Sequence, residues 1–351
     1  MCGIVGAVAE RNIANILLEG LKRLEYRGYD SAGLTVIRDG ELHRERQVGK
    51  VQALVDAVAI NPDFLNGHIG IAHTRWATHG EPAQRNAHPH VSGKIAVVHN
   101  GIVENYAELK EDLLAKGYEF TSQTDTEVVA HLINDLYQHT HDLLEAVRAV
   151  IPKLHGAFAL GIIHVDCPDE LITVRLGSPL VIGVGIGENF IASDQLALLP
   201  VTNRFMYLEE GDIAKITRDS IQVYANGIEV KRSIHEIDAK QHNADKGEFK
   251  HYMLKEIYEQ PDAVGRTLEM AVNTDECSTL RDDFLQRHEP KLAGIRHIQI
   301  IACGTSYHAG MVAKYWFENL TRLPCSVEIA SEFRYRNPVV VDNSLMICIS
   351  Q

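Results

Sequence analysis

The distribution of apolar residues divides the chain into two parts with different patterns. Up to residue 237, short runs that are apolar or alternate with polar residues predict strands. Asp39-Gly40 lies between two of these runs and predicts a tight hairpin turn. The predicted strands are Cys2–Val8, Leu34–Ile37, Glu41–Gln47, His68–His73, Ile95–His99, Ala157–Val165, Leu171–Arg175, Leu180–Gly185, Phe205–Leu208, Ile213–Thr217 and Ile221–Tyr224.

Apolar residues that recur every three to four positions predict helices in the same part. The first is capped by Asn12 and ends before Gly28, and three more are predicted over Asn105–Lys116, Thr126–Tyr137 and Leu143–Leu154. Strands and helices come in blocks and do not alternate strictly. This order favours an α+β domain of packed layers with antiparallel sheets over a doubly wound parallel sheet.

The pattern changes after residue 237, where a polar, aperiodic stretch predicts a linker. Beyond it, strands and helices alternate, which is typical of an α/β doubly wound domain. We therefore predict a first domain over 2–237, a linker over 238–250 and a second domain over 251–351. The predicted elements of the second domain are helices near Tyr252–Gln260, Asp262–Met270 and Tyr307–Asn319, and strands over His297–Ala302, Val327–Ala330 and Leu345–Ile349.

Length, charge and cysteine content narrow the classes of function. The 351 residues carry 34 basic and 47 acidic side chains, and the net charge of -13 argues against nucleic acid or an anionic membrane as the main partner. The six cysteines are scattered, with no Cys-x-x-Cys pair, so they predict neither a disulfide framework nor a zinc ribbon. No apolar run is long enough to span a membrane. We expect a cytoplasmic protein.

Cys2 is the first candidate for chemistry because it directly follows Met1. Cys has a small side chain, so Met1 is a candidate for removal by methionine aminopeptidase. Cys2 would then carry both a thiol and a free α-amine with an ordinary pKa of about 7.7–8.0. Such an amine can accept the thiol proton without a partner histidine, as in N-terminal threonine nucleophiles. The alternative interpretation is a buried cysteine that acts as a small apolar residue.

Three further segments have polar residues that complement this nucleophile. They are Ala72–Gly80, Val98–Ile102 and Thr124–Glu127. Asn100 supplies an NH₂ donor, and Gly101 lets its backbone N–H approach a ligand closely, so together they can hold an oxyanion. A simple turn is the alternative interpretation of Asn100-Gly101.

These segments, together with Cys2–Gly6, resemble the class II glutamine amidotransferases. The resemblance covers roughly Cys2 to Ile237, and Tyr26–Gly33 and Asn86–His90 strengthen it. It implies an N-terminal nucleophile domain with four αββα layers that hydrolyses glutamine to glutamate and ammonia. Cys2 would be the nucleophile.

The same resemblance implies which residues bind glutamine. Arg75 would grip the carboxylate with two hydrogen bonds, and Asp125 would pair with the ammonium. A solvated charge at a strand end is the alternative for Arg75, and a helix N-cap, alone or combined with substrate binding, is the alternative for Asp125. Trp76, Thr78 and His79 lie in what resembles a loop that closes over the substrate, with Gly80 as its hinge.

Several histidines lie close together in the sequence, among them His73, His79, His88, His90 and His99. No carboxylate or thiol completes a set at zinc-like spacing, so metal catalysis is not favoured. His88-Pro89-His90 is better interpreted as a rigid loop. Neither a metal nor an organic cofactor is predicted.

The second domain contains small and hydroxyl-bearing residues where a strand meets a helix, at Cys303–Ser306. Free N–H groups at such a junction bind phosphate, and a helix N-cap by Thr305 or Ser306 is the alternative. With Ile329–Arg336 and Ser350-Gln351, this turn resembles the sugar-isomerase domain of enzymes that transfer the amide nitrogen of glutamine to fructose 6-phosphate. The resemblance implies Thr305, Ser306, Ser350 and Gln351 as partial phosphate ligands.

The combined resemblance implies formation of glucosamine 6-phosphate and glutamate by a homodimer that assembles through the sugar-isomerase domain. Because the chain stops at the end of an apolar strand, whose open edge would favour aggregation, we expect the second domain to be incomplete. Two alternatives stay open. One is a glutaminase that serves another acceptor, as in phosphoribosyl-pyrophosphate amidotransferases or asparagine synthetases, and the other is a non-catalytic chain that binds glutamine or sugar phosphate.

Overall fold

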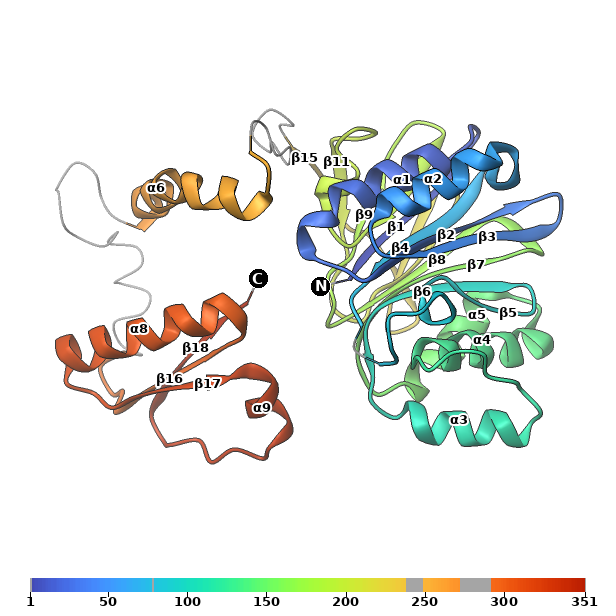
Figure 1. Cartoon of the computed structure of the whole chain (residues 1–351). Helices are drawn as coiled ribbons and strands as arrows, with labels where there is room; N and C mark the ends of the chain where they lie inside the picture. Colours follow the sequence, from blue (N-terminus) through green and yellow to red (C-terminus); the bar gives the residue numbers. More distant parts are fainter. Residues whose placement is uncertain (1, 78, 238–248, 272–291, 351) are drawn as a thin grey trace. The chain divides into compact units, whose positions relative to one another are not determined.

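The computed structural model of the chain describes residues 2–77, 79–237, 249–271 and 292–350 (Figure 1). By their internal contacts the residues form two compact units, Met1–Glu248 and Phe249–Gln351. Each unit is described by itself. The domain boundaries at 237 and 251 stay predictions, and most of the predicted linker lies outside the described residues.

The first unit contains two antiparallel sheets. The first sheet has eight strands in the order β15-β11-β9-β10-β1-β4-β2-β3. Strand β1 lies at its centre, paired with β10 on one side and β4 on the other. The strands are β1 (Gly3–Ala9), β2 (Ser31–Arg38), β3 (Glu41–Val48), β4 (Ile69–Arg75), β9 (Val181–Val184), β10 (Glu188–Ala192), β11 (Arg204–Tyr207) and β15 (Ile234–Glu236).

The second sheet has seven strands in the order β14-β13-β12-β8-β7-β6-β5. Its longest run of pairing joins β6 to β7, from Ile95↔His164 to Val103↔Gly156. The strands are β5 (His90–Ser92), β6 (Ile95–Val103), β7 (Gly156–His164), β8 (Cys167–Leu176), β12 (Ile213–Ile216), β13 (Ile221–Ala225) and β14 (Ile228–Val230).

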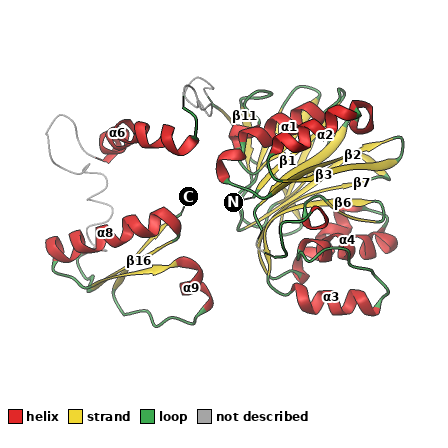
Figure 2. Cartoon of the chain, in the orientation of Figure 1, coloured by secondary structure: helices red, strands yellow, loops and turns green. Residues whose placement is uncertain are grey.

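Helices cover the outer face of each sheet (Figures 1 and 2). Helices α1 (Ala14–Arg23) and α2 (Val51–Ile60) cover the first sheet, and α3 (Tyr106–Ala115), α4 (Thr126–Thr140) and α5 (Leu143–Val150) lie on the side of the second. Short 3₁₀ turns occur at Glu25–Arg27, Pro62–Leu65, Gln84–Asn86, Ile151–Lys153 and Gln195–Ala197.

Three apolar cores hold these four layers together. Successive side chains of a strand point to opposite faces of its sheet, so Val5 packs under the helices of the first sheet and Ile4 packs between the sheets. The third core joins the second sheet to α4 and α5 through residues such as Val97 and Val129. The predicted αββα arrangement with antiparallel sheets is therefore confirmed.

The predicted hairpin at Asp39-Gly40 joins β2 to β3, and both residues have positive φ. This conformation is typical of the two-residue turns that suit the twist of a hairpin. Helix α2 was not predicted, because Val51, Val55 and Val58 favour strands by their β-branched side chains.

Asn100-Gly101 does not form the turn that was one interpretation of this dipeptide. Strand β6 continues through it, with Asn100 opposite Ala159 and Gly101 opposite Phe158. The φ of Gly101 is 125°, and a Cβ there would lie 2.0 Å from the carbonyl oxygen of Ala157. Only glycine permits this close pairing at the end of β6.

The second unit contains a parallel three-stranded sheet in the order β17-β16-β18. Its elements are α6 (Tyr252–Ala271), β16 (His297–Ala302), α8 (Gly304–Thr321), β17 (Cys325–Ile329), α9 (Ala330–Tyr335) and β18 (Ser344–Ile349). The predicted crossover pattern is confirmed. The two helices predicted before and after residue 261 form a single helix with Pro261 inside it, so that division was wrong.

We expect Gly101→Ala to lower the free energy of unfolding of the first unit by about 3 kcal/mol or more, because backbone strain adds to a clash that neither strand can relieve. The matched control is Gly117→Ala. Gly117 also has positive φ, but no atom lies within 4 Å of its missing Cβ, so a loss of about 1–2 kcal/mol is expected.

Denaturant titration in a Trp316→Phe background measures this difference, since Trp76 in the first unit is then the remaining tryptophan. Equal losses for the two glycine variants would contradict the role of the close β6–β7 approach.

Candidate active site

Cys2 directly precedes β1, where its sulfur contacts the backbone that follows β4. The Trp76 N–H donates to Sγ at 3.1 Å, and Sγ lies 3.5 Å from the Trp76 carbonyl oxygen. Burial raises the pKa of the Cys2 thiol, more than the Trp76 N–H lowers it. The thiol is therefore protonated at neutral pH, and its use as a nucleophile requires a base.

The start of β1 is held closely on both sides. A Cβ on Gly3 would lie 2.6 Å from Thr74 Oγ1, so only glycine allows β1 to approach β4 this closely here. On the other side, the Ile4 N–H donates to Ser193 Oγ and the Ser193 N–H donates to the Ile4 carbonyl, both at 3.0 Å. These contacts fix the backbone from which the Cys2 side chain extends.

Asn100 connects this strand to the second sheet. Its Nδ2 donates to the carbonyl oxygen of Cys2 at 3.1 Å, and its Oδ1 lies 2.9 Å from Nε2 of His73. Asn100 is 6% exposed, and Gly101 follows it in β6. The structure thus brings together Cys2, Asn100 and Gly101, which the sequence separates by almost a hundred positions.

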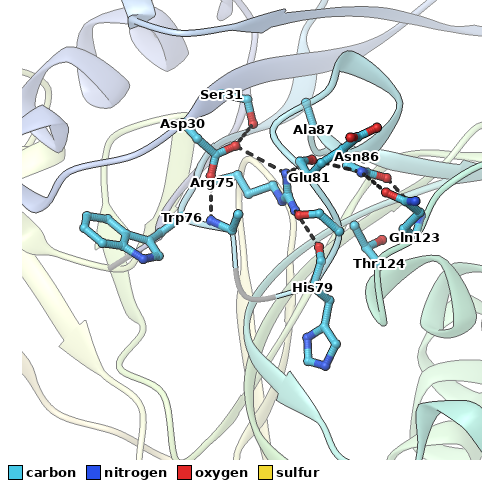
Figure 3. A network of polar contacts seen from close by, with 12 residues as sticks. Asp30, Ser31, Arg75, Trp76, His79, Glu81, Asn86, Ala87, Gln123 and Thr124 are labelled. Atoms are coloured by element: carbon cyan, nitrogen blue, oxygen red, sulfur yellow. Dashed lines mark hydrogen bonds and ion pairs between the residues drawn. The ribbon is translucent and has the colours of Figure 1, made fainter.

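Arg75 ends β4 and is only 3% exposed. Its guanidinium donates to the carbonyl oxygens of His79 at 2.5 Å, Gly80 at 2.8 Å and Glu81 at 3.2 Å, and to Asp30 Oδ1 at 3.3 Å. Figure 3 shows the side chain between Asp30 and this loop. The alternative of a solvated charge is wrong, because the loop backbone surrounds the cation. Recognition of a carboxylate stays a prediction.

Asp30 was not among the predicted site residues, although the segment Tyr26–Gly33 contains it. Its Oδ2 accepts the Ala77 N–H at 2.5 Å, while its Oδ1 accepts from Ser31 Oγ and Arg75. Asp30 therefore fixes both ends of the turn after β4. Its spacing from Arg75 in the sequence gives no sign of this contact, which depends on the pairing of β2 with β4.

The loop residues predicted to cover a substrate have different surroundings. Trp76 is 52% exposed, and its ring lies against Gly28. The ring of His79 makes an edge contact with that of Tyr106, with centroids 5.1 Å apart. In Figure 3 the rings of Trp76 and His79 point away from the Arg75 guanidinium. Thr78 lies outside the described residues.

Gly80 has a φ of 76°, which a residue with a side chain rarely adopts. Its neighbour Glu81 accepts at its carbonyl from Asn86 Nδ2 at 3.0 Å, and the same amide donates to Gln123 Oε1 at 2.9 Å. These contacts, visible in Figure 3, tie the loop to the segment that leads into α4. The role of Gly80 as a hinge stays a prediction.

Asp125 is the N-cap residue of α4, as one interpretation predicted, but its side chain makes no capping hydrogen bond. Its Oδ2 instead accepts the Val103 N–H at 2.8 Å and lies 4.0 Å from Nδ1 of His99. The carboxylate is 4% exposed and joins β6 to α4. Pairing with a substrate ammonium stays a prediction.

One pocket collects most of these groups. It contains a thiol, a cation, a carboxylate and the backbone of the predicted oxyanion site. Its lining residues are Cys2, Arg75, Trp76, His79, His88, His99, Gly101, Thr124, Asp125 and Thr126.

Four buried histidines form a cluster at this pocket, and two of them, His88 and His99, line it. The rings of His73 and His88 have centroids 4.1 Å apart, and those of His88 and His90 are 4.8 Å apart. Thr126 Oγ1 lies 2.9 Å from both His88 Nε2 and His99 Nδ1. Burial lowers the pKa of His73 and of His90 to about 3 and also lowers those of His88 and His99.

All four histidines are consequently neutral at physiological pH. Among the residues that the structure describes, no three His, Cys, Asp or Glu side chains are arranged to hold a metal ion. The sequence showed these histidines only as neighbours along the chain. Their packing against one another was missed, because it results from the packing of the two sheets: His73 lies in β4 of the first sheet, and His90 and His99 lie in β5 and β6 of the second.

In the second unit, Cys303 is the N-cap residue of α8, and its side chain makes no capping hydrogen bond. Thr305 and Ser306 lie in the first turn of the helix, so the N-cap interpretation of these residues is wrong. Ala302 of β16 is paired with Ile349 of β18 in parallel register, which places Ser350 at the same sheet edge as the start of α8. Gln351 lies outside the described residues.

Comparison with known proteins identifies both parts of the chain. Residues 73–200 match the family described as a glutamine amidotransferase domain, and residues 291–351 match the SIS domain. The glutamine–fructose-6-phosphate aminotransferase (isomerizing) of Acinetobacter baylyi is 68% identical over 351 residues, which are 100% of this chain and 56% of that protein. Over its whole length the chain is similar to the glutamine–fructose-6-phosphate aminotransferases.

The aminotransferase of the same name from Pseudomonas putida is 57% identical and is also matched over 57% of its length. The chain therefore spans a little over half the length of the curated family members that it matches. A solved glutamine phosphoribosylpyrophosphate amidotransferase from B. subtilis, in complex with ADP and GMP, aligns over 97% of this chain and 69% of its own. With a TM-score of 0.56 and 21% identity, it supports the fold alone. Within the described ranges, no helix is long and apolar enough to cross a membrane.

The buried histidines predict a loss of stability in mild acid. Their pKa values are lower in the folded state than the ordinary value near 6.5, so below pH 6.5 the unfolded chain binds more protons. Stability then falls with decreasing pH, by up to about 1.4 kcal/mol per pH unit for each such histidine. Hydrogen bonds from Thr121 and Ser122 outweigh burial and lower the pKa of Glu127, so this carboxylate stays ionised between pH 6.5 and 5.

Denaturant unfolding between pH 6.5 and 5 checks this expectation. Burial lowers the pKa of His164 to about 4. His164→Gln removes this titrating group, so the free energy of unfolding should fall less steeply with decreasing pH, by up to about 1.4 kcal/mol per pH unit. A flat profile for the unmodified chain would contradict the neutral, buried cluster.

Proposed function

We propose that the first unit hydrolyses glutamine and that Cys2 is its nucleophile. The observation that carries this proposal is the single pocket that contains Cys2, Arg75, Gly101 and Asp125, with Asn100 bound to the Cys2 carbonyl. The matched glutamine amidotransferase family and the named relatives support it.

The reaction begins after removal of Met1, when the α-amine of Cys2 accepts the thiol proton. Because burial raises the pKa of this thiol, the transfer needs a base close to the sulfur. Burial lowers the pKa of His88 and His99, so both are weak bases. An α-amine with an ordinary pKa of about 7.7–8.0 is better matched to this task.

Sulfur then attacks the amide carbon of glutamine, and the carbonyl oxygen becomes an oxyanion. One hydrogen of Asn100 Nδ2 is used by the Cys2 carbonyl, which leaves the other, with the Gly101 N–H, to hold this charge. The protonated amine of Cys2 gives its proton to the departing ammonia. Water, deprotonated by the same amine, hydrolyses the thioester and releases glutamate.

Substrate recognition is proposed for the charged groups of the pocket. Arg75 binds the glutamine carboxylate in exchange for the loop carbonyls to which it donates, and Asp125 pairs with the ammonium. Trp76, Thr78 and His79 complete the loop over the substrate. The exchange of carbonyls for a carboxylate couples binding to a movement of residues 79–81.

For the second unit we propose a sugar-phosphate site at the start of α8. The parallel pairing of β16 and β18, which brings Thr305 and Ser306 to the sheet edge of Ser350, supports it. Gln351 is proposed as a further ligand. In a protein of the length of the relatives, fructose 6-phosphate would accept the ammonia to give glucosamine 6-phosphate, in a cytoplasmic homodimer that assembles through the sugar-isomerase domain.

The same experiments distinguish two other functions from this one. A glutaminase with another acceptor would release ammonia and show no affinity for fructose 6-phosphate, and the match of residues 291–351 to a SIS domain disfavours it. A non-catalytic chain would bind glutamine or sugar phosphate without turnover.

The 351-residue chain should release ammonia from glutamine, and Cys2→Ala should reduce this rate by about 10⁴-fold or more, because the nucleophile is lost. Cys167→Ala is the control, since Cys167 is half-buried in β8 and does not line the pocket. Glutamate formation, followed by mass spectrometry, measures the rate. Undiminished activity in Cys2→Ala would exclude the proposed mechanism.

Asp125→Asn should raise KM for glutamine by about tenfold or more, because hydrogen bonds to charged groups contribute about 1.5–3 kcal/mol. The asparagine oxygen can still accept the Val103 N–H, so the fold is kept. Asp112→Asn, on α3 and outside the pocket, is the matched control. An unchanged KM in steady-state assays would remove Asp125 from substrate binding.

A further inference from the structure

The orientation of the Asn100 side-chain amide is fixed by its two partners. One is the carbonyl oxygen of Cys2, which can only accept, so the amide nitrogen must face it at 3.1 Å. The amide oxygen therefore faces His73 Nε2 at 2.9 Å. Since an oxygen that faces a ring nitrogen needs a donor, Nε2 of His73 must carry the proton.

The surroundings of His73 keep it in this single state. The side chain is fully buried, and its ring lies against that of His88. With the proton on Nε2, Nδ1 is the acceptor nitrogen, and the ring also lies within hydrogen-bonding reach of the His99 backbone. The imidazole is thus a fixed donor directed at Asn100.

Loss of this donor would affect the proposed oxyanion site. The final torsion of an asparagine side chain is broad and roughly two-fold, so two orientations of the amide are available. The inverted one would place Oδ1 beside the Cys2 carbonyl and remove the second Nδ2 hydrogen from the oxyanion. Repulsion by Cys2 opposes that inversion, and the His73 donor opposes it from the other side.

We propose that His73 is a positioning residue that holds the Asn100 amide in the orientation required for stabilising the oxyanion. This inference rests on the proposed glutaminase function. His73 acts through Asn100, and it is not among the residues that line the pocket. Its role is to keep an N–H donor in place before the reaction begins, which is the condition for effective electrostatic stabilisation.

Kinetics on the full 351-residue chain test the proposal. His73→Leu should lower kcat for glutamine hydrolysis by about 10- to 100-fold, which is below the 10²–10³-fold cost of removing an oxyanion donor outright. KM should change by less than about threefold, because ground-state binding does not use the oxyanion. His73→Gln, whose amide nitrogen replaces Nε2, should restore most of kcat.

His164→Leu is the matched control. His164 is equally buried, on β7, and burial lowers the pKa of this histidine too, but it contacts Tyr137 and the Asp166 N–H and does not line the pocket. It should lose stability and keep kcat. Equal losses of kcat in the two leucine variants, or no rescue by His73→Gln, would show that His73 serves only the stability of the fold and would overturn the proposal.

A second measurement does not depend on activity. The ¹⁵N NMR shifts of His73, assigned by comparison with His73→Gln, should show a neutral ring protonated on Nε2 at pH 7. A ring protonated on Nδ1 would mean that the Asn100 amide is inverted and would overturn the proposal. If the unmodified chain does not hydrolyse glutamine, the proposed function fails, and with it the catalytic purpose of His73, while the NMR result still decides the orientation.

Discussion

The whole site depends on the insertion of β1 between β4 and β10, which places Cys2 where the two sheets of the first unit meet. On the side of β4, the Trp76 N–H donates a hydrogen bond to the Cys2 sulfur. On the side of the second sheet, Asn100 donates one to the Cys2 carbonyl oxygen. Gly3 permits this approach, since any side chain there would meet Thr74. The proposed nucleophile is thus positioned mainly by the backbone, and a side chain from β6 completes its surroundings.

Burial then decides which groups can do the chemistry. It raises the pKa of the thiol and lowers those of the nearby histidines, so the thiol is a poor acid and the imidazoles are poor bases. Loop carbonyls and Asp30 stabilise the buried cation of Arg75. These constraints favour the α-amine of Cys2 as the base, and they explain why polar groups in this pocket serve mainly to orient one another.

Much of the fold could be predicted from local patterns, because the spacing of apolar residues along a strand or a helix indicates which of its faces is buried. The hairpin at Asp39-Gly40 and the strand His297–Ala302 are confirmed, as are the antiparallel layers. Patterns failed where distant contacts decide the structure. Asn100-Gly101 is strand because β7 pairs with it. The contacts of Asp30 follow from the pairing of β2 with β4, and those of the buried histidines follow from the packing of the two sheets. Spacing along the chain indicates neither.

The central claim is that one residue supplies both the attacking sulfur and the base that activates it. A diazoketone analogue of glutamine, which alkylates the nucleophile that binds it, tests this claim most directly when intact mass and N-terminal sequencing follow the reaction. We predict one adduct per chain, located on Cys2, in chains that begin with Cys2. An adduct on another residue, or equally rapid labelling of chains that retain Met1, would contradict the account.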